Sequence, residues 1–284
     1  MNNILITHEF PNDFYQTGYA ETHTDFDYCL IHRYLDTPSY AEYMRNAVKK
    51  GRTVYLDNGV YELGKAFNWE DYVKVIKELR PTYYILPDVF NQVEDNIDSQ
   101  ITFYNRYYED ILEEAGSLPI AIPHGLTLDS LKFSIKIFDN ILDKKAIIAI
   151  PFGSAAFEKD GIYSEKDIPY IPVRQAMNRK SFVIDMLQEF PNRKYHLLGC
   201  KSICEFDNWD DEISKENIVS IDTSIPVALS FEGLKFKYSH FYKPLFLIDK
   251  NFNMDQPDES TITLINKNIK TFKRHVNMWH NNYN

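Results

Sequence analysis

The sequence predicts a single α/β domain, residues 1–284, folded as a (β/α)8 TIM barrel. Short apolar runs recur along the chain, helix-like segments lie between most of them, and no Gly/Ser-rich linker divides the 284 residues. A chain of this length can bury roughly three quarters of its unfolded surface in one or two compact domains. Strand followed by helix, repeated about eight times, is typical of a barrel, although a doubly wound open sheet shows the same alternation.

Short runs along the chain have the length and the β-branched or aromatic content of buried parallel strands. Each run ends in polar residues, as expected where a strand leaves the sheet. In chain order the runs are 3–7, 28–32, 53–57, 83–88, 120–124, 146–152, 195–199 and 218–222.

Apolar residues at intervals of three and four predict helices between these strands. The clearest helical segments are 69–79, 93–114, 128–141 and 173–189. A last helix covers about 261–281, and we expect its apolar face to pack on the barrel wall. That face consists of Ile262, Ile265, Ile269, Phe272, Val276 and Trp279.

Motifs and composition argue against several classes of function. The first run leads into residues 8–11 without the GxGxxG turn of a dinucleotide-binding fold, and no GxxxxGK[ST] loop of a P-loop nucleotide triphosphatase occurs. Three cysteines, Cys29, Cys200 and Cys204, are too few for a disulfide framework and provide no CxxC pair for zinc. We therefore expect neither a cofactor nor a metal.

Hydropathy indicates where the protein is located, and net charge indicates which partners it can bind. No apolar run approaches the ~20 residues of a membrane span, and the first residues lack the features of a signal peptide. We expect a soluble cytoplasmic protein, in the host cytoplasm if the chain is viral. The net charge of −10 argues against coating of nucleic acid by bulk charge.

One basic surface remains as a candidate for nucleic-acid binding. Lys267, Lys270 and Arg274 fall on one face of the last predicted helix, opposite its apolar stripe. No acidic residue occurs from residue 264 onward. We expect this face to be solvated and able to meet phosphates; an ordinary solvated helix face is the alternative.

In a barrel the active site lies at the C-terminal ends of the strands, so the polar residues that follow the runs are candidates. Asp57, Asp88 and Asp222 end three different runs. Carboxylates that share one mouth shift each other's pKa values and suit acid–base and nucleophilic work at an acetal carbon. The alternatives are that each Asp caps a helix, that Asn58 forms a turn and that His124 packs under a loop.

The order of these motifs resembles that of the tRNA-guanine transglycosylases over roughly residues 50 to 230. Residues 56–62, Leu-Asp-Asn-Gly-Val-Tyr-Glu, resemble the family's Asp-Ser-Gly-Gly-Phe-Gln segment, and Ile-Leu-Pro-Asp at 85–88 is similar to its base-recognition aspartate segment. Residues 120–126 resemble its Val-Gln-Gly-Gly strand end, and 149–153 the glycine-rich strand that follows. Residues 195–199 resemble Tyr-Leu-Met-Gly, and 221–226 resemble the Phe-Asp-Cys-Val-x-Pro segment that carries the nucleophile.

The resemblance implies a pentosyltransferase in which a carboxylate attacks C1′ of a nucleoside, guanine leaves and a 7-deazaguanine takes its place. It implies Asp222 as the nucleophile, Asp57 as the general acid–base group, and Asp88 as the acceptor of two hydrogen bonds from a guanine-like base. The remaining base-binding positions would be Asn58, His124, Phe152, Gly153, Leu198 and Gly199.

Two departures from the family pattern bear on which nucleic acid is the substrate. The tRNA enzymes usually carry a zinc site of cysteines and histidine after the nucleophile strand, whereas no cysteine follows Cys204 here. They also carry an arginine after a Pro-Thr pair, where this chain has Pro-Val-Ala at 226–228. A zinc-less chain is similar to relatives, often from phages or mobile elements, that insert 7-deazaguanines into DNA. DNA is therefore the favoured substrate; tRNA, or a different barrel glycosidase or base-binding protein, are the alternatives.

Overall fold

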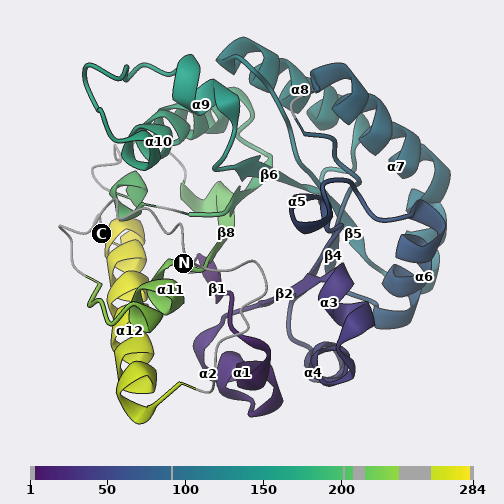
Figure 1. Ribbon diagram of the computed structural model, residues 1–284. Coiled ribbons are helices and arrows are strands. Elements are labelled where there is room, and N and C mark those ends of the chain that lie inside the picture. The colour runs from purple at the N-terminus through teal and green to yellow at the C-terminus, as the bar shows by residue number, and fades with distance from the viewer. Residues whose placement is uncertain (1–3, 91, 201, 207–214, 237–256, 282–284) are drawn as a thin grey trace.

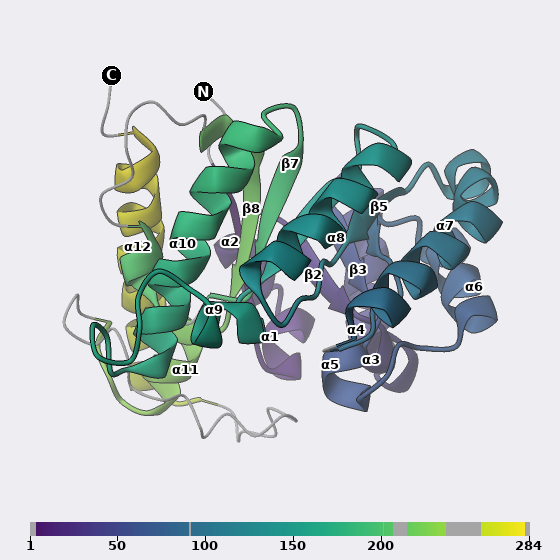
Figure 2. The ribbon, with the colours of Figure 1, turned by 90° about the horizontal axis from the view of Figure 1, so that it is seen from above.

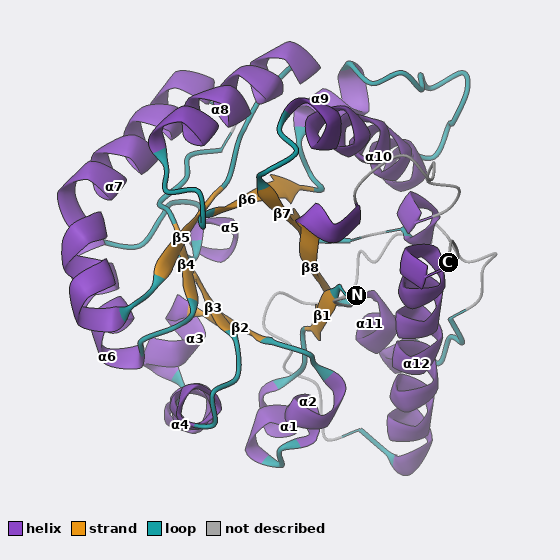
Figure 3. Ribbon diagram, turned by 180° about the vertical axis from the view of Figure 1, so that it is seen from behind, coloured by secondary structure: helices purple, strands orange, loops and turns teal. Residues whose placement is uncertain are grey.

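The computed structural model (Figure 1) describes residues 4–90, 92–200, 202–206, 215–236 and 257–281, with side chains of the last segment to residue 277. One sheet of eight parallel strands has the order β1-β8-β7-β6-β5-β4-β3-β2, and helices surround it (Figure 3). Because β1 pairs with β8, the sheet curls into a nearly closed TIM-barrel-like fold. The predicted α/β barrel is confirmed, and the open doubly wound sheet is excluded.

Each predicted apolar run overlaps one strand. The strands are β1 (Leu5–His8), β2 (Asp27–Leu30), β3 (Val54–Asp57), β4 (Tyr83–Ile85), β5 (Leu118–Ala121), β6 (Ile147–Pro151), β7 (Lys194–Leu198) and β8 (Ile218–Thr223).

The helices expected from apolar periodicity are all present, as α6 (Trp69–Leu79), α7 (Val93–Ala115), α8 (Leu128–Ile141), α10 (Ile171–Glu189) and α12 (Glu259–Asn281). The structure adds helices that the pattern did not single out. These are α1 (Asn12–Gln16), α2 (Tyr19–His23), α3 (Ile31–Asp36), α4 (Pro38–Lys49), α5 (Val60–Leu63), α9 (Ala155–Lys159) and α11 (Ile225–Phe231), with the 3-10 turns η1 (Ile203–Phe206) and η2 (Lys215–Asn217).

The barrel closes between β1 and β2 through one residue rather than through a ladder. The backbone N–H of Asp25 donates to the carbonyl of Ile6 at 2.8 Å. In return, the N–H of Ile6 donates to the Asp25 carboxylate at 3.0 Å. Asp25 also pairs with Lys273 of α12 at 2.7 Å, so this seam is tied to the last helix.

Apolar side chains fill the barrel and separate it from the helices. The interior cluster contains Phe26, Tyr55, Ile85, Ile120, Ile122, Ile147 and Ala149. A larger cluster lies between the sheet and the helices, and it includes Ile265, Ile269, Phe272 and Val276 of α12. These four residues of the predicted apolar face are buried in that cluster, and the side chain of Trp279 lies outside the described residues.

The surface of α12 also matches the predicted pattern. Lys267, Lys270 and Arg274 are exposed, opposite the buried stripe. Among the described helices, none combines the length and the apolar character needed to cross a membrane.

Candidate active site

A β-bulge in β8 decides that Asp222 faces the inside of the barrel. The register with β7 shifts by one residue around Val219, which packs on the interior cluster. The next residue, Ser220, also faces inward, because its hydroxyl lies 2.9 Å from that of Tyr55, and Ile221 belongs to the outer cluster. Strict alternation after an inward Val219 would turn Asp222 outward. The extra residue shifts the inward–outward alternation of side chains by one position, so Asp222 points into the mouth of the barrel.

Asp57, the last residue of β3, is a buried carboxyl with two donors. The hydroxyl of Tyr28 donates to Oδ1 at 3.1 Å, and the N–H of Gly59 donates to Oδ2 at 2.7 Å. Burial raises the pKa of Asp57 well above its ordinary value; the nearby Glu62 and Asp88 carboxylates add to the rise, and the two hydrogen bonds oppose it. A carboxyl group with a raised pKa is suited to protonate a leaving group.

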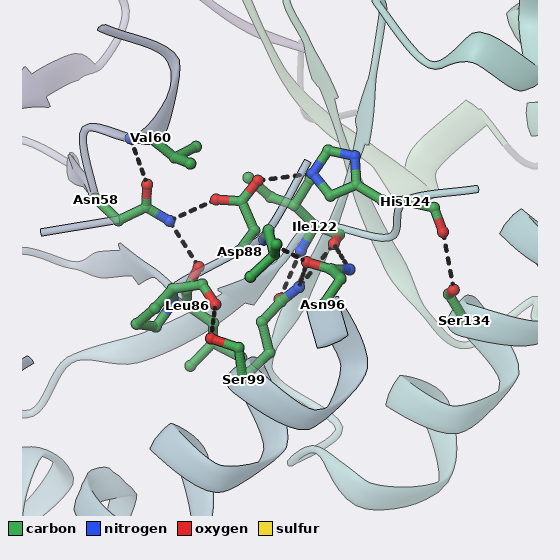
Figure 4. Close-up of polar contacts among 12 residues, drawn as sticks. Asn58, Val60, Leu86, Asp88, Asn96, Ser99, Ile122, His124 and Ser134 are labelled. Atoms are coloured by element: carbon green, nitrogen blue, oxygen red, sulfur yellow. Dashed lines mark hydrogen bonds and ion pairs between the residues drawn. The ribbon is translucent and has the colours of Figure 1, made fainter. Parts of the chain in front are cut away.

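Asp88 follows β4 and lies between Asn58 and His124, as Figure 4 shows. The amide of Asn58 donates to Asp88 Oδ1 at 2.7 Å, and His124 Nε2 lies 2.7 Å from Asp88 Oδ2. Asp88 itself is only 1% exposed. Because each carboxylate oxygen has two lone pairs, each keeps one for a further donor. The carboxylate is thus clamped in place, with one lone pair left on each oxygen.

The side chain of Asn58 both forms a turn with its own backbone and holds the carboxylate of Asp88. Its Oδ1 accepts from the N–H of Val60 at 3.0 Å, which confirms the turn interpretation, and its Nδ2 also donates to the carbonyl of Leu86 at 2.7 Å. The residue is fully buried. Its amide is therefore used within the protein, and any effect on a bound base acts through Asp88.

Side chains of α7 and α8 hold the strand ends that carry this clamp (Figure 4). Asn96 donates to the carbonyl of Ile122 at 3.0 Å, and Gln100 accepts from the N–H of the same residue at 2.9 Å. Ser134 donates to the carbonyl of His124 at 3.1 Å. Buried, satisfied amides of this kind fix the backbone from which the site residues project.

Asp222 in β8 accepts at one oxygen and is open at the other. The N–H of Gly199 donates to Oδ1 at 2.7 Å, and His196 Nε2 lies 3.0 Å from the same oxygen. Oδ2 has no hydrogen bond among the described residues, and the side chain is 17% exposed. Gly199 has a φ of 67°, a conformation that favours glycine, and this turn aims its N–H at the carboxylate.

None of the three candidate aspartates caps a helix. The helices that follow their strands have Gly59, Gln92 and Ser224 at the N-cap, and the side chains that accept from the first N–H of α5 and α11 are those of Asn58 and Thr223, not of an aspartate. The capping alternative is therefore wrong for Asp57, Asp88 and Asp222.

Arg179 of α10 ties together the ends of β6 and β7, where the other predicted base-binding positions lie. Its Nη1 donates to the carbonyls of Ile150 at 3.0 Å and Leu198 at 2.9 Å, and its guanidinium lies 5.0 Å from the centre of the Phe152 ring. Glu205 accepts from Nε at 2.5 Å and from Nη2 at 2.6 Å, with both side chains fully buried.

The structure brings the base-binding candidates to the same end of the barrel but gives them different exposure. Phe152 is buried under the Arg179 guanidinium, Gly153 is exposed, and Leu198 and Gly199 are partly buried. Lys267, Lys270 and Arg274 are not part of this mouth, since they lie on the outer wall on α12 (Figure 1).

Tyr28 and His196, which the sequence pattern did not single out, connect the two catalytic candidates. The Tyr28 hydroxyl donates to Asp57, and its ring stacks on the His196 imidazole with centroids 6.3 Å apart. Burial raises the pKa of Tyr28, and the charges of Asp57 and Asp222 add to the rise. Both carboxylates are therefore within electrostatic reach of one phenol.

Glu9 is a further acidic residue that the sequence pattern did not single out. It continues the alternation of β1, in which Leu5 packs on the interior cluster, beyond the last paired residue. Burial raises the pKa of Glu9 from 4.5 to about 7; Asp222 and Glu62 add to the rise and Arg33 opposes it. Extending the inward alternation of the first strand by two residues would have found it.

We expect Glu9→Gln to stabilise the protein above about pH 7 and to leave its stability unchanged below about pH 4.5. The folded state binds the Glu9 proton more tightly than the unfolded chain, so this carboxyl contributes stability at low pH that is lost as pH rises through about 7. A shift of this size corresponds to at most about 3 kcal/mol. Urea unfolding of both proteins across this pH range measures the difference, with the exposed Glu113→Gln as control. A difference that does not depend on pH would contradict the burial of this charge.

Comparison with protein-family models finds none that matches the chain, and comparison with curated proteins finds no relative.

Proposed function

We propose that the protein is a guanine transglycosylase that exchanges guanine in a nucleic acid, DNA in preference to tRNA, for a 7-deazaguanine base. One observation carries the proposal: two carboxyl groups of opposite character face the same barrel mouth. Asp57 is buried, which raises its pKa, whereas Asp222 is partly exposed and has one oxygen without a hydrogen bond among the described residues. This pairing suits a general acid and a nucleophile at a glycosidic carbon.

The exchange needs two displacements at C1′. Asp222 Oδ2 attacks C1′ of the target nucleotide, the C1′–N9 bond breaks with its electron pair going to guanine, and Asp57 protonates the departing base. The sugar remains as an ester of Asp222. The incoming 7-deazaguanine then gives its N9 proton to Asp57, N9 attacks C1′, and the ester bond breaks to release the Asp222 carboxylate.

Asp88 supplies selectivity for guanine in this proposal. Its two remaining lone pairs match the N1–H and 2-amino donors of a guanine-like ring, while adenine presents an acceptor at N1. A site built to accept two hydrogen bonds disfavours a base that leaves them unmade.

We expect Asp88→Asn to weaken the binding of free guanine by about 1–3 kcal/mol, because an amide accepts at one atom only and presents a donor to a donor. The same amide nitrogen also faces either Asn58 or His124, so the clamp loosens as well. Calorimetry with free base measures the change, and thermal unfolding shows whether the variant is folded. The exposed Asp110→Asn on α7 is the matched control. Unchanged affinity in a folded Asp88 variant would remove Asp88 from the base pocket.

Incorporation of labelled base into duplex DNA and into tRNA, side by side, tests the function itself. We expect labelled guanine and a labelled 7-deazaguanine to enter DNA, with no label in tRNA. Label in tRNA alone would move the substrate to the other polymer and keep the mechanism. No label in either polymer, from a folded protein, would reject the transglycosylase proposal.

The basic face of α12 is the candidate track for the polymer. The helix runs from the barrel end that carries α5 and α11 toward the end at which the chain begins (Figure 2). We expect Gln at Lys267, Lys270 and Arg274 together to weaken nucleic-acid binding at low salt. Each lost phosphate contact should lower the slope of log K against log salt by about 0.9. Binding isotherms over a salt series measure both effects.

A triple variant at a different surface serves as the control. Replacing three exposed lysines near α8 with Gln gives the same change in net charge; these are Lys136, Lys144 and Lys145. We expect this control triple, and the binding of free guanine to either triple, to differ little from the wild type. If the α12 triple keeps the wild-type affinity and salt slope, the polymer track lies on the loops that follow the strands.

A further inference from the structure

His196 of β7 contacts the Asp222 carboxylate from inside the barrel and is fully buried. Its Nε2 lies 3.0 Å from Asp222 Oδ1, but the ring N–H points off the line to that oxygen, so the free protein makes no aligned hydrogen bond there. A buried donor without an aligned partner destabilises the free protein. The unaligned donor of His196 faces the carboxylate of Asp222. Catalytic hydrogen bonds often become aligned only in the substrate complex.

Two hydroxyl groups set which ring nitrogen of His196 carries the proton. Ser220 Oγ lies 2.8 Å from Nδ1, and Tyr55 Oη lies 2.9 Å from Ser220 Oγ. When Tyr55 donates to Ser220 and Ser220 donates to Nδ1, every member of the chain is satisfied and the ring proton lies on Nε2. The other tautomer would present a nitrogen lone pair to the Asp222 carboxylate, which is repulsive. The network therefore favours the Nε2–H form.

Aromatic rings enclose the imidazole and limit its rotation. Tyr28 stacks on it at an interplanar angle of 21°, whereas Tyr55 and Phe26 meet it edge to face, with centroids 5.5 Å and 6.2 Å away. An imidazole held on three sides keeps Nε2 directed at the same place. The Asp222 side chain lies on the solvent side of this contact, so it is the carboxylate rather than the imidazole that has room to change orientation.

We propose that His196 is a positioning residue that holds Oδ1 of Asp222, together with the N–H of Gly199, so that Oδ2 is the oxygen presented to C1′. This inference rests on the proposed function, because the oxygen it aims is the proposed nucleophile. When the sugar ester forms on Oδ2, Oδ1 becomes the ester carbonyl oxygen, keeps the hydrogen bond from the Gly199 N–H and comes into line with the His196 Nε2–H. When the incoming base displaces the ester, negative charge returns to the carboxylate, and the same two donors stabilise it.

Substitutions that copy one ring nitrogen at a time test the proposal. In His196→Gln the side-chain amide reaches the place of Nε2, in His196→Asn it reaches the place of Nδ1, and His196→Phe has neither. The measurements are the single-turnover rate of covalent adduct formation, the affinity for free guanine and the melting temperature. We expect Gln to keep most of the rate, and Asn and Phe to lose about 100-fold, with guanine affinity unchanged.

Other patterns in the same series would overturn the proposal. Rescue by Asn but not by Gln would mean that the imidazole serves Ser220 alone, as a structural residue. Equal rates in all folded variants would mean that His196 does not aim the nucleophile. A loss of rate that follows the melting temperature rather than the position of the amide would likewise assign it a structural role.

A measurement without turnover separates this inference from the proposed function. Nitrogen-15 NMR of the wild type, with the His196 signals identified by their loss in His196→Asn, should show the Nε2–H tautomer, and Asp222→Asn should shift it. If the wild type forms no adduct but shows this response, the transglycosylase function is rejected and the His196–Asp222 contact stands. If the wild type forms the adduct while His196 carries its proton on Nδ1, the positioning role is wrong.

Discussion

We expect Asp222→Ala to abolish base exchange while the protein still folds. Without the carboxylate no sugar ester can form, so kcat should fall by about 10⁴-fold or more. The side chain is 17% exposed, and its polar contacts among the described residues are with Gly199 and His196, so we expect its loss to cost little stability. Trapping of a covalent adduct between the wild-type protein and its polymer, followed by the same experiment on the variant, measures the effect.

The exposed Asp110→Ala on α7 is the control for this experiment, and we expect it to exchange bases at the wild-type rate. Melting temperatures of both variants should lie close to that of the wild type. Near wild-type turnover in Asp222→Ala would show that the nucleophile is another group, and Glu9 would be the next carboxyl to replace because the Asp222 charge already acts on it.

The largest effect on stability is expected from Glu205→Ala. Its carboxylate and the Arg179 guanidinium form a pair that is fully buried on both sides. Removing one partner leaves a charge buried without compensation, which costs about 3–5 kcal/mol. Because Arg179 also holds the carbonyls of Ile150 and Leu198, we expect the ends of β6 and β7 to loosen and guanine binding to weaken. Chemical denaturation and calorimetry with free base measure the two effects.

An exposed ion pair provides the control for this prediction. Lys77 and Glu114 lie 2.7 Å apart at the surface, and Glu114→Ala should cost less than about 1 kcal/mol. A double variant, Arg179→Met with Glu205→Leu, should recover part of the loss, since no unpaired charge remains. A cost for Glu205→Ala as small as that for Glu114→Ala would show that the buried pair does not hold the strand ends.

Local patterns were enough to predict the strands and the long helices. A buried parallel strand needs a short apolar run, and an amphipathic helix needs apolar residues three and four positions apart, so both leave a signal within a dozen residues. The helix α4 shows where this signal weakens. Its buried face has helical spacing but consists of Tyr40, Ala41, Tyr43, Met44 and Ala47, and tyrosines and alanines also occur on exposed surfaces.

The candidate site was predictable only where it coincides with the ends of the apolar runs. Asp57, Asp88 and Asp222 close three runs, and the barrel rule places all three at one mouth. His196 lies within its apolar run, whereas Glu9 lies beyond the end of the first run. His196 carries no local sign of function, because its partners, Ser220 and Asp222, come from the neighbouring strand. Glu9 is found only when the inward alternation of β1 is extended beyond the end of its run.

The sequence by itself determined the alternation of strands and helices, the apolar face of the last helix and the carboxylates at the strand ends, because each depends on residues that are near one another in the chain. The pairing of β1 with β8 decided between the barrel and an open sheet. Only the tertiary structure decided which way Asp222 points, since the bulge at Val219 is defined by pairing with β7. It also decided that burial raises the pKa of Asp57 and that His196 faces Asp222. Burial, charge and hydrogen bonding between distant segments set these properties, and they exist only once the barrel has closed.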